Sequence, residues 1–286
     1  MEEIDDIFET QLDSGEIPTL MMNYDEGTEK WVDTVAITMV AVYLAQLNPK
    51  WEKKWRKNIE AALEFIEKKT YKHKIEDLRL WHFNGFYPPD WEDTGFAIYL
   101  LVKNGRLNIS KLESLKTLFL GNATEDGVGV WVKDSYSSDN KKNNQWDPTS
   151  SLNILRLYYI LQIDRAECEK AERFIMKYLS LDKFEKGTLY YTAPIAAFFA
   201  KRLISDFSID SNIFSNAVNN FYQEVVDAIL KGLLEATSFE RALFGLHIKE
   251  IDDGSIFHHG MRIEICYGSP VLCKLALLNL WIGMKY

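Results

Sequence analysis

One pattern of hydrophobic and polar positions recurs along the chain. Each copy begins with one or a few polar or aromatic residues, here called the lead. A small or helix-capping residue follows, and then a long, mostly apolar run. The copies cover residues 31–47, 91–105, 146–161, 191–204, 236–248 and 267–283. A sequence pattern that recurs at intervals of tens of residues predicts stacked supersecondary units.

Each copy predicts the start of a buried helix. Asp, Thr or Ser before an apolar run accepts hydrogen bonds from the first free N–H groups of a helix, and Pro suits the first helical turn. The runs are apolar almost all round, which is typical of helices buried on every side.

Charge-rich amphipathic segments separate these runs. They cover residues 48–69, 108–120, 164–181 and 215–235, each with one polar and one apolar face at helical spacing. Buried helices that alternate with half-exposed helices predict an all-α fold, an α/α toroid of about six helical hairpins with an inner and an outer ring.

The repeat is interrupted between His247 and Tyr267. This stretch is too short and too rich in β-branched residues for another outer helix, so we expect a loop or a small hairpin to close the ring. Few strands are expected elsewhere. No Gly/Ser-rich linker or low-complexity tract divides the chain, which favours a single α/α-barrel domain over residues 1–286.

Aromatic residues make up 13% of the chain, a high share. In such a toroid all inner helices begin at the same end, so their aromatic leads are expected to surround one mouth and to form the wall of a cavity. For each ring, packing in the core without ligand contact remains an equal alternative. The candidate substrate-binding rings are Trp31, Trp91, Trp131, Trp146, Tyr190, Tyr191 and Tyr267.

Charge and cysteine content narrow the function classes. The formal net charge of -9 argues against a nucleic-acid surface, which needs clustered Lys and Arg. Cys168, Cys266 and Cys273 form no CxxC pair, so a reducing cytoplasm is expected. The acidic N-terminus resembles no signal segment, and no apolar run reaches the ~18 residues of a membrane span. Transient contact with a membrane remains compatible with the sequence, because an apolar substrate would partition into the lipid.

Three carboxylates stand in front of the second buried run. Asp93 alone could be a helix cap, because Asp33 and Asp147 hold matching points in other copies. Asp90 and Glu92 have no counterparts there. Crowded carboxyls in apolar surroundings cannot all ionise, so the pKa of at least one is expected to rise. Such a group is a Brønsted acid beside an apolar cavity.

The stretch Asp90-Trp91-Glu92-Asp93-Thr94-Gly95 resembles the DxDDTA motif of class II terpene cyclases, the squalene-hopene cyclase group. That family builds its barrel from α/α hairpins. The sequence has Glu for the middle Asp and Gly for the final Ala. The resemblance implies that Glu92 protonates a terminal alkene or epoxide, with Asp90 and Asp93 as partners. Because Glu is one methylene longer than Asp, Asp93 is an equal alternative as the donor.

The repeat layout extends this resemblance over nearly the whole chain, which has room for one barrel. It implies a monodomain class II cyclase that converts an isoprenoid or prenylated aromatic substrate into a meroterpenoid, with no metal or other cofactor. Aromatic rings would stabilise the carbocations. The DDxxD magnesium motif of ionising terpene synthases is absent from the sequence, because Asp252-Asp253 is followed by Gly254-Ser255.

Residues 257–273 carry a rival site. His258, His259, Cys266 and Cys273 are possible zinc ligands. Cys266-Tyr267-Gly268 resembles the CYG element of lanthionine cyclases, which are also α/α toroids, but no Cys-His-Gly element follows. Alternatively the segment is a packed loop, or a cavity lid through which His258 or His259 touches the substrate.

Other functions remain alternatives to a cyclase. A non-catalytic toroid that binds a lipid or a peptide would not need Asp90 and Glu92. A sugar-active toroid would need two carboxylates set apart, whereas these carboxylates form one cluster. Arg156, Arg241 and Arg262 could bind an oxyanion of a substrate, but ion pairing or exposure is the more common role for arginine.

Overall fold

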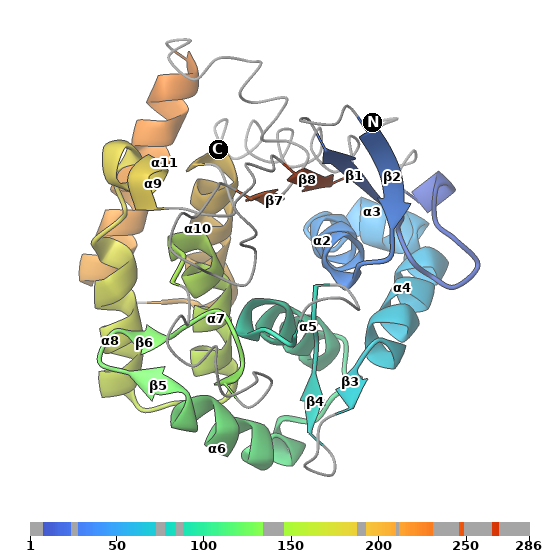
Figure 1. The fold of residues 1–286 in the computed structure, drawn as a ribbon, viewed down its shortest axis with the longest axis horizontal. Helices are drawn as coiled ribbons and strands as arrows, with labels where there is room; N and C mark the ends of the chain where they lie inside the picture. Colours follow the sequence, from blue (N-terminus) through green and yellow to red (C-terminus); the bar gives the residue numbers. More distant parts are fainter. Residues whose placement is uncertain are drawn as a thin grey trace.

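The computed structural model describes residues 8–23, 28–72, 78–83, 88–133, 146–187, 193–209, 212–230, 246–248 and 265–268. The architecture is that of two layers of helices around a common centre (Figure 1). Buried side chains from both layers form one large hydrophobic core.

The inner layer contains α2 (Val35–Ala45), α5 (Trp91–Lys103), α7 (Pro148–Ile160) and α10 (Ala193–Phe207). α2, α5 and α7 lie within predicted copies, and α10 begins in the copy at 191–204 and continues three residues beyond it. α5 and α7 are buried along almost their whole length. Thr34 caps α2, because its hydroxyl accepts a hydrogen bond from the backbone N–H of Ala36. The prediction of buried helices is confirmed for these four copies.

The outer layer contains α3 (Pro49–Lys54), α4 (Arg56–Lys68), α6 (Glu113–Gly121), α8 (Arg165–Met176) and α11 (Asn212–Leu230). α3, α4 and α8 fall inside the predicted amphipathic segments, and α6 and α11 overlap theirs, with α11 beginning three residues earlier than predicted. The short helix α9 (Leu181–Gly187) follows α8, and the 3-10 turn η1 (Ile109–Lys111) precedes α6. The outer helices α4, α6, α8 and α11 bury one face and expose the other, whereas α3 has no buried residue.

The inner helices run parallel. Glu92 and Ser150 meet near the starts of α5 and α7, while Tyr43, Arg156 and Asp206 meet in the later parts of α2, α7 and α10. A toroid requires this arrangement, because every inner helix returns to the same end of the ring through an outer helix.

A small antiparallel sheet joins strands that are far apart in the sequence. Its order is β2-β1-β8-β7, with β2 (Thr28–Val32), β1 (Thr19–Asn23), β8 (Ile265–Gly268) and β7 (Leu246–Ile248). Two further pairs are β3 (Tyr71–Lys72) with β4 (Arg79–Leu80), and β5 (Ala123–Thr124) with β6 (Gly127–Val128). The sequence did not predict β1 and β2.

The sheet also tests the closure of the ring. β7 pairs with β8 in antiparallel fashion, which favours the hairpin over the loop as the alternative expected between His247 and Tyr267. Residues 246–248 were predicted to end a helix, and this was wrong, because they hydrogen-bond to β8 as a strand. The rest of the 236–248 copy and residues 269–283 lie outside the described residues.

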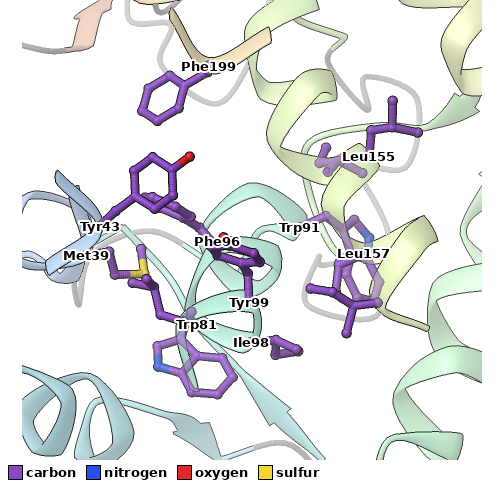
Figure 2. Packing of buried hydrophobic residues seen from close by; sticks show 14 of the residues in the cluster. Met39, Tyr43, Trp81, Trp91, Phe96, Ile98, Tyr99, Leu155, Leu157 and Phe199 are labelled. Atoms are coloured by element: carbon purple, nitrogen blue, oxygen red, sulfur yellow. The ribbon is translucent and has the colours of Figure 1, made fainter. Parts of the chain in front are cut away.

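Aromatic rings from three inner helices meet in the core. Phe96 of α5 contacts Phe199 of α10, with ring centroids 6.0 Å apart, and Tyr43 of α2, at 5.4 Å. Figure 2 shows these three rings turned toward one another. Phe96 therefore marks the face of α5 that points to the centre of the toroid.

Candidate active site

Backbone hydrogen bonds hold the start of α5 on both sides. Asp90 pairs with Trp81 on one side and with Trp131 on the other. Its N–H donates to the carbonyl of Trp81 at 3.1 Å, and the N–H of Trp91 donates to the carbonyl of Val130 at 2.7 Å. The first turn of α5 is thus held on a fixed frame.

Asp90, and not Asp93, caps the helix. One carboxylate oxygen of Asp90 accepts a hydrogen bond from the backbone N–H of Asp93 at 2.7 Å. Asp93 therefore lies inside the first turn and is free of the capping role that the sequence left open for it. Both side chains are buried, with relative exposures of 4% and 8%.

Glu92 is held by the neighbouring inner helix. The hydroxyl of Ser150 donates to one carboxylate oxygen at 2.5 Å, and the side-chain amide of Asn153 donates to the other at 2.9 Å. Asp147 positions Ser150, because its carboxylate accepts hydrogen bonds from the N–H groups of Thr149 and Ser150, both at 2.9 Å. The start of α7 thus supplies two fixed hydrogen-bond donors to the Glu92 carboxylate.

Helical geometry places both candidate acids beside the inward face. Successive residues are about 100° apart around a helix axis. Glu92 therefore lies about 40° to one side of Phe96 and Asp93 about 60° to the other side. Glu92 turns toward α7, so the two carboxyls flank the centre-facing stripe from opposite sides.

Burial and like charge act together on these acids. Burial raises the pKa of Asp93, the neighbouring Glu92 charge raises it further, and a hydrogen bond with Asp90 partly offsets them, leaving the pKa at about 8. Burial, together with the charge on Asp93, raises the pKa of Asp90 well above its ordinary range. At neutral pH the Asp90–Asp93 pair consequently retains a proton.

Comparisons with known proteins show that the fold occurs in other solved structures. The chain is similar to a solved protein from Actinoplanes, with 13% identity and a TM-score of 0.57 over 98% of this chain and 72% of that one. It is also similar to the type II terpene cyclase MstE from Scytonema, solved in complex with its product merosterolic acid A, with 13% identity and a TM-score of 0.50 over 98% and 94% of the two chains. The chain shares its fold with a terpene cyclase. No family model and no curated protein sequence matches it.

The predicted aromatic leads do not all face the centre. Trp91 lies about 140° around α5 from Phe96. Its ring packs on Phe119 of α6 with centroids 5.0 Å apart, on the side of α5 away from Tyr43 (Figure 2). Trp146 packs on Phe174 of α8 at 4.8 Å. Both indoles thus contact outer-layer rings, which favours the core-packing alternative over contact with a substrate.

The other predicted binding residues divide into three groups. Trp131 is buried and its backbone pairs with Asp90, which keeps it beside the acids. Trp31 and Tyr267 lie in β2 and β8, of which only the backbone is described. Outside the described residues lie Tyr190, Tyr191, His258 and His259.

Residues that the sequence reading missed complete the site. Ser150 and Asn153 contact Glu92, and the signal for them was a run of polar residues in a helix that is otherwise apolar. Arg156 lies farther along α7, fully buried and paired with Asp206 at 2.8 Å. This pairing favours the ion-pair alternative for Arg156 over substrate binding.

Two further features of the described residues bear on other classes of protein. In the described ranges no group of three or more His, Cys, Asp or Glu side chains is placed to hold a metal ion. Among the helices of these ranges, none combines the length and the apolar character needed to cross a membrane.

Proposed function

We propose that this protein is a class II terpene cyclase that protonates a linear isoprenoid or a prenylated aromatic compound and guides its cyclisation. The observation that carries the proposal is the buried carboxyl cluster, which retains a proton at neutral pH beside the inward face of α5. The fold shared with the type II terpene cyclase MstE, which was solved in complex with its product merosterolic acid A, supports it.

Asp93 is the proposed proton donor. It keeps its proton up to about pH 8 partly because Glu92, held by Ser150 and Asn153, supplies a negative charge beside it. The same charge would stabilise the carbocation that forms when the proton is transferred. Glu92 thus acts as a fixed anion, although it occupies the position of the donor in the family motif.

The reaction conserves all atoms of the substrate. Asp93 transfers its proton to the terminal alkene or epoxide, the resulting cation is attacked by the next double bond, and successive bonds close the rings. Loss of a proton from the last cation ends the cascade, and water reprotonates Asp93. The product is an isomer of the substrate, which distinguishes cyclisation from hydrolysis or prenyl transfer.

Carbocation contacts are proposed for rings near the helix starts. The rings of Tyr43, Phe96 and Tyr99 already surround the Arg156 guanidinium, at 4.9–5.5 Å from their centroids. A second cation at that depth would be repelled by Arg156. Trp131 beside Asp90, together with Trp31, Tyr190, Tyr191 and Tyr267, remains a proposed contact, and His258 and His259 are proposed to touch the substrate from the closing segment.

The pH dependence of turnover tests the roles of the two acids. With farnesylated para-hydroxybenzoate as substrate, we expect wild-type activity to fall above about pH 8, where Asp93 loses its proton. Asp93→Asn is expected to abolish isomer formation. Glu92→Gln removes the neighbouring charge, so residual activity should fall at a lower pH than in the wild type.

A different result would identify another acid or another function. If Glu92→Gln abolished turnover while Asp93→Asn retained it, Glu92 would be the donor. If both folded variants retained full turnover, the cyclase proposal would fail. Product mass and retention time against the substrate provide the readout.

A further inference from the structure

Buried polar atoms without a partner gather on one stripe of α7. In the described part of the chain, such atoms include the Thr149 hydroxyl, Asn153 Oδ1 and two nitrogens of Arg156. At about 100° per residue, these three side chains fall within a sector of about 60° and span about 10 Å along the helix. Arg156 contacts rings of α2 and α5, so this stripe faces the centre of the toroid.

Arg156 has a structural explanation. Its guanidinium bonds to Asp206 and is faced by three aromatic rings, whose π electrons attract the cation in place of further oxygen acceptors. Thr149 and Asn153 have no such compensation for these atoms. Thr149 has a relative exposure of 0% and Asn153 of 3%.

An unpartnered polar atom in such a place is costly. A buried hydrogen-bonding group left unsatisfied costs about 1–3 kcal/mol. Thr149 and Asn153 are one helical turn apart, on the same stripe, at the depth where Asn153 also holds Glu92. A hydrocarbon at this position would leave both atoms unsatisfied. A substrate oxygen that accepts a hydrogen bond from the Thr149 hydroxyl, and after protonation donates one to Asn153 Oδ1, would satisfy both.

We propose that Thr149 and Asn153 bind an oxygen atom at the reacting end of the substrate, and that the enzyme prefers a terminal epoxide over a terminal alkene. This inference rests on the proposed cyclase function and names its substrate class. The Thr149 hydroxyl donates to the epoxide oxygen and orients it toward the acid.

The chemistry balances within this site. Asp93 protonates the epoxide oxygen, the bond from that oxygen to the tertiary carbon breaks, and the next double bond attacks the carbon. The oxygen stays on the product as a hydroxyl group. This hydroxyl keeps its new proton and donates a hydrogen bond to Asn153 Oδ1. An oxygen lone pair is also a stronger base than a double bond, so a weak carboxylic acid is better matched to an epoxide.

The test compares two substrates that differ by one atom. The wild-type enzyme is given farnesylated para-hydroxybenzoate and its terminal epoxide, and kcat/KM for isomer formation is measured for each. We expect the epoxide to be preferred at least about tenfold, the worth of roughly one hydrogen bond. Thr149→Val should lower kcat/KM for the epoxide about tenfold and change the alkene value less than about twofold.

Stability separates a binding role from a packing role. Because the Thr149 hydroxyl has no partner in the folded protein, Thr149→Val is expected to keep or raise the midpoint of thermal unfolding. Thr149→Ser keeps the hydroxyl and should retain the epoxide preference, which covers the case in which Val does not fold. Thr38→Val is the matched control, because the Thr38 hydroxyl accepts a bond from the N–H of Ile17 at 2.9 Å. It should lower the midpoint and keep the preference.

The outcomes are distinguishable from failure of the cyclase proposal. Equal turnover of the alkene and the epoxide, unaffected by Thr149→Val, would overturn the epoxide inference and leave the cyclase function intact. Such a result would also mean that the two side chains bind only an ordered water. Turnover of neither substrate would contradict the cyclase function and this inference with it.

Discussion

Asp93 is distinguished by what surrounds its carboxyl. An aspartate in the first turn of a helix normally gains from the helix dipole and stays ionised. Here burial and the charge of Glu92 outweigh that effect, and the pKa rises to about 8 from an ordinary value of 3.8. The proton that suits Asp93 to acid catalysis is also a proton that folding takes up.

This uptake makes stability depend on pH. Between about pH 4 and about pH 8 the unfolded chain releases the Asp93 proton while the folded protein keeps it. The free energy of unfolding should therefore fall as pH rises, by up to about 1.4 kcal/mol per pH unit for this proton. Asp93→Asn should reduce the slope, as measured by urea denaturation across this range. Asp164→Asn, at an exposed helix start, should leave the slope as in the wild type.

At the scale of elements, the site depends on how closely α5 approaches α7. Gly95 lies at this contact, and a Cβ built there would come 3.1 Å from Leu157 Cγ and 3.2 Å from the carbonyl oxygen of Asn153. This explains why Gly replaces the alanine of the resembled motif. The close approach also brings Ser150 and Asn153 within hydrogen-bonding distance of Glu92.

Gly95→Ala is expected to be destabilising despite the better helix propensity of alanine. Alanine gains about 1 kcal/mol in a helix interior, but overpacking against the Asn153 backbone costs about 1–3 kcal/mol. We expect a net loss of about 1 kcal/mol and lower cyclisation, measured by urea denaturation and by product yield. Gly121→Ala in α6 is the matched control, because a Cβ there meets nothing within 4 Å. If Gly95→Ala proved as stable and active as Gly121→Ala, close packing would not define the site.

Across the whole molecule, one buried ion cluster ties inner helices together. Asp206 of α10 accepts hydrogen bonds from Arg156 of α7 at 2.8 Å, from Tyr43 of α2 at 2.6 Å and from Arg202 at 3.2 Å. Tyr99 of α5 packs its ring on the Arg156 guanidinium. The cluster lies toward the ends of these helices, away from the acids at their starts.

Breaking this cluster should destabilise the fold more than changing any surface charge. Arg156→Met leaves Asp206 buried without its main cation, which costs about 3–5 kcal/mol for buried pairs. Arg202→Gln should cost less, because the Arg202 side chain is 33% exposed while that of Arg156 is 0% exposed. Both are measured by urea denaturation. Adding Asp206→Leu to Arg156→Met should recover part of the loss, and no recovery would contradict the ion-pair explanation.

The pattern of apolar runs determined much of this fold. Alternation of wholly apolar and amphipathic segments predicted the helices of the four described hairpins and their division into inner and outer layers, because burial of a helix face requires the matching side-chain period. The unusual carboxylates at residues 90–93 likewise identified the candidate acids. The strands β1 and β2 were not predicted, since the sheet they form depends on the pairing of β1 with β8, a contact between segments far apart in the sequence.

Tertiary structure decided the parts that depend on direction and distance. Sequence alone made Trp91 and Trp146 equal candidates to the other rings, and only packing places them between the layers. The sequence also could not decide whether Asp93 caps the helix, because capping depends on which carboxylate accepts a hydrogen bond from which backbone N–H. Two features arise where α7 lies against α5. They are the hydrogen-bond donors to Glu92 and the unpartnered atoms of Thr149 and Asn153. Composition and spacing fix what a helix can bury, but the orientation of neighbouring helices fixes which atoms meet.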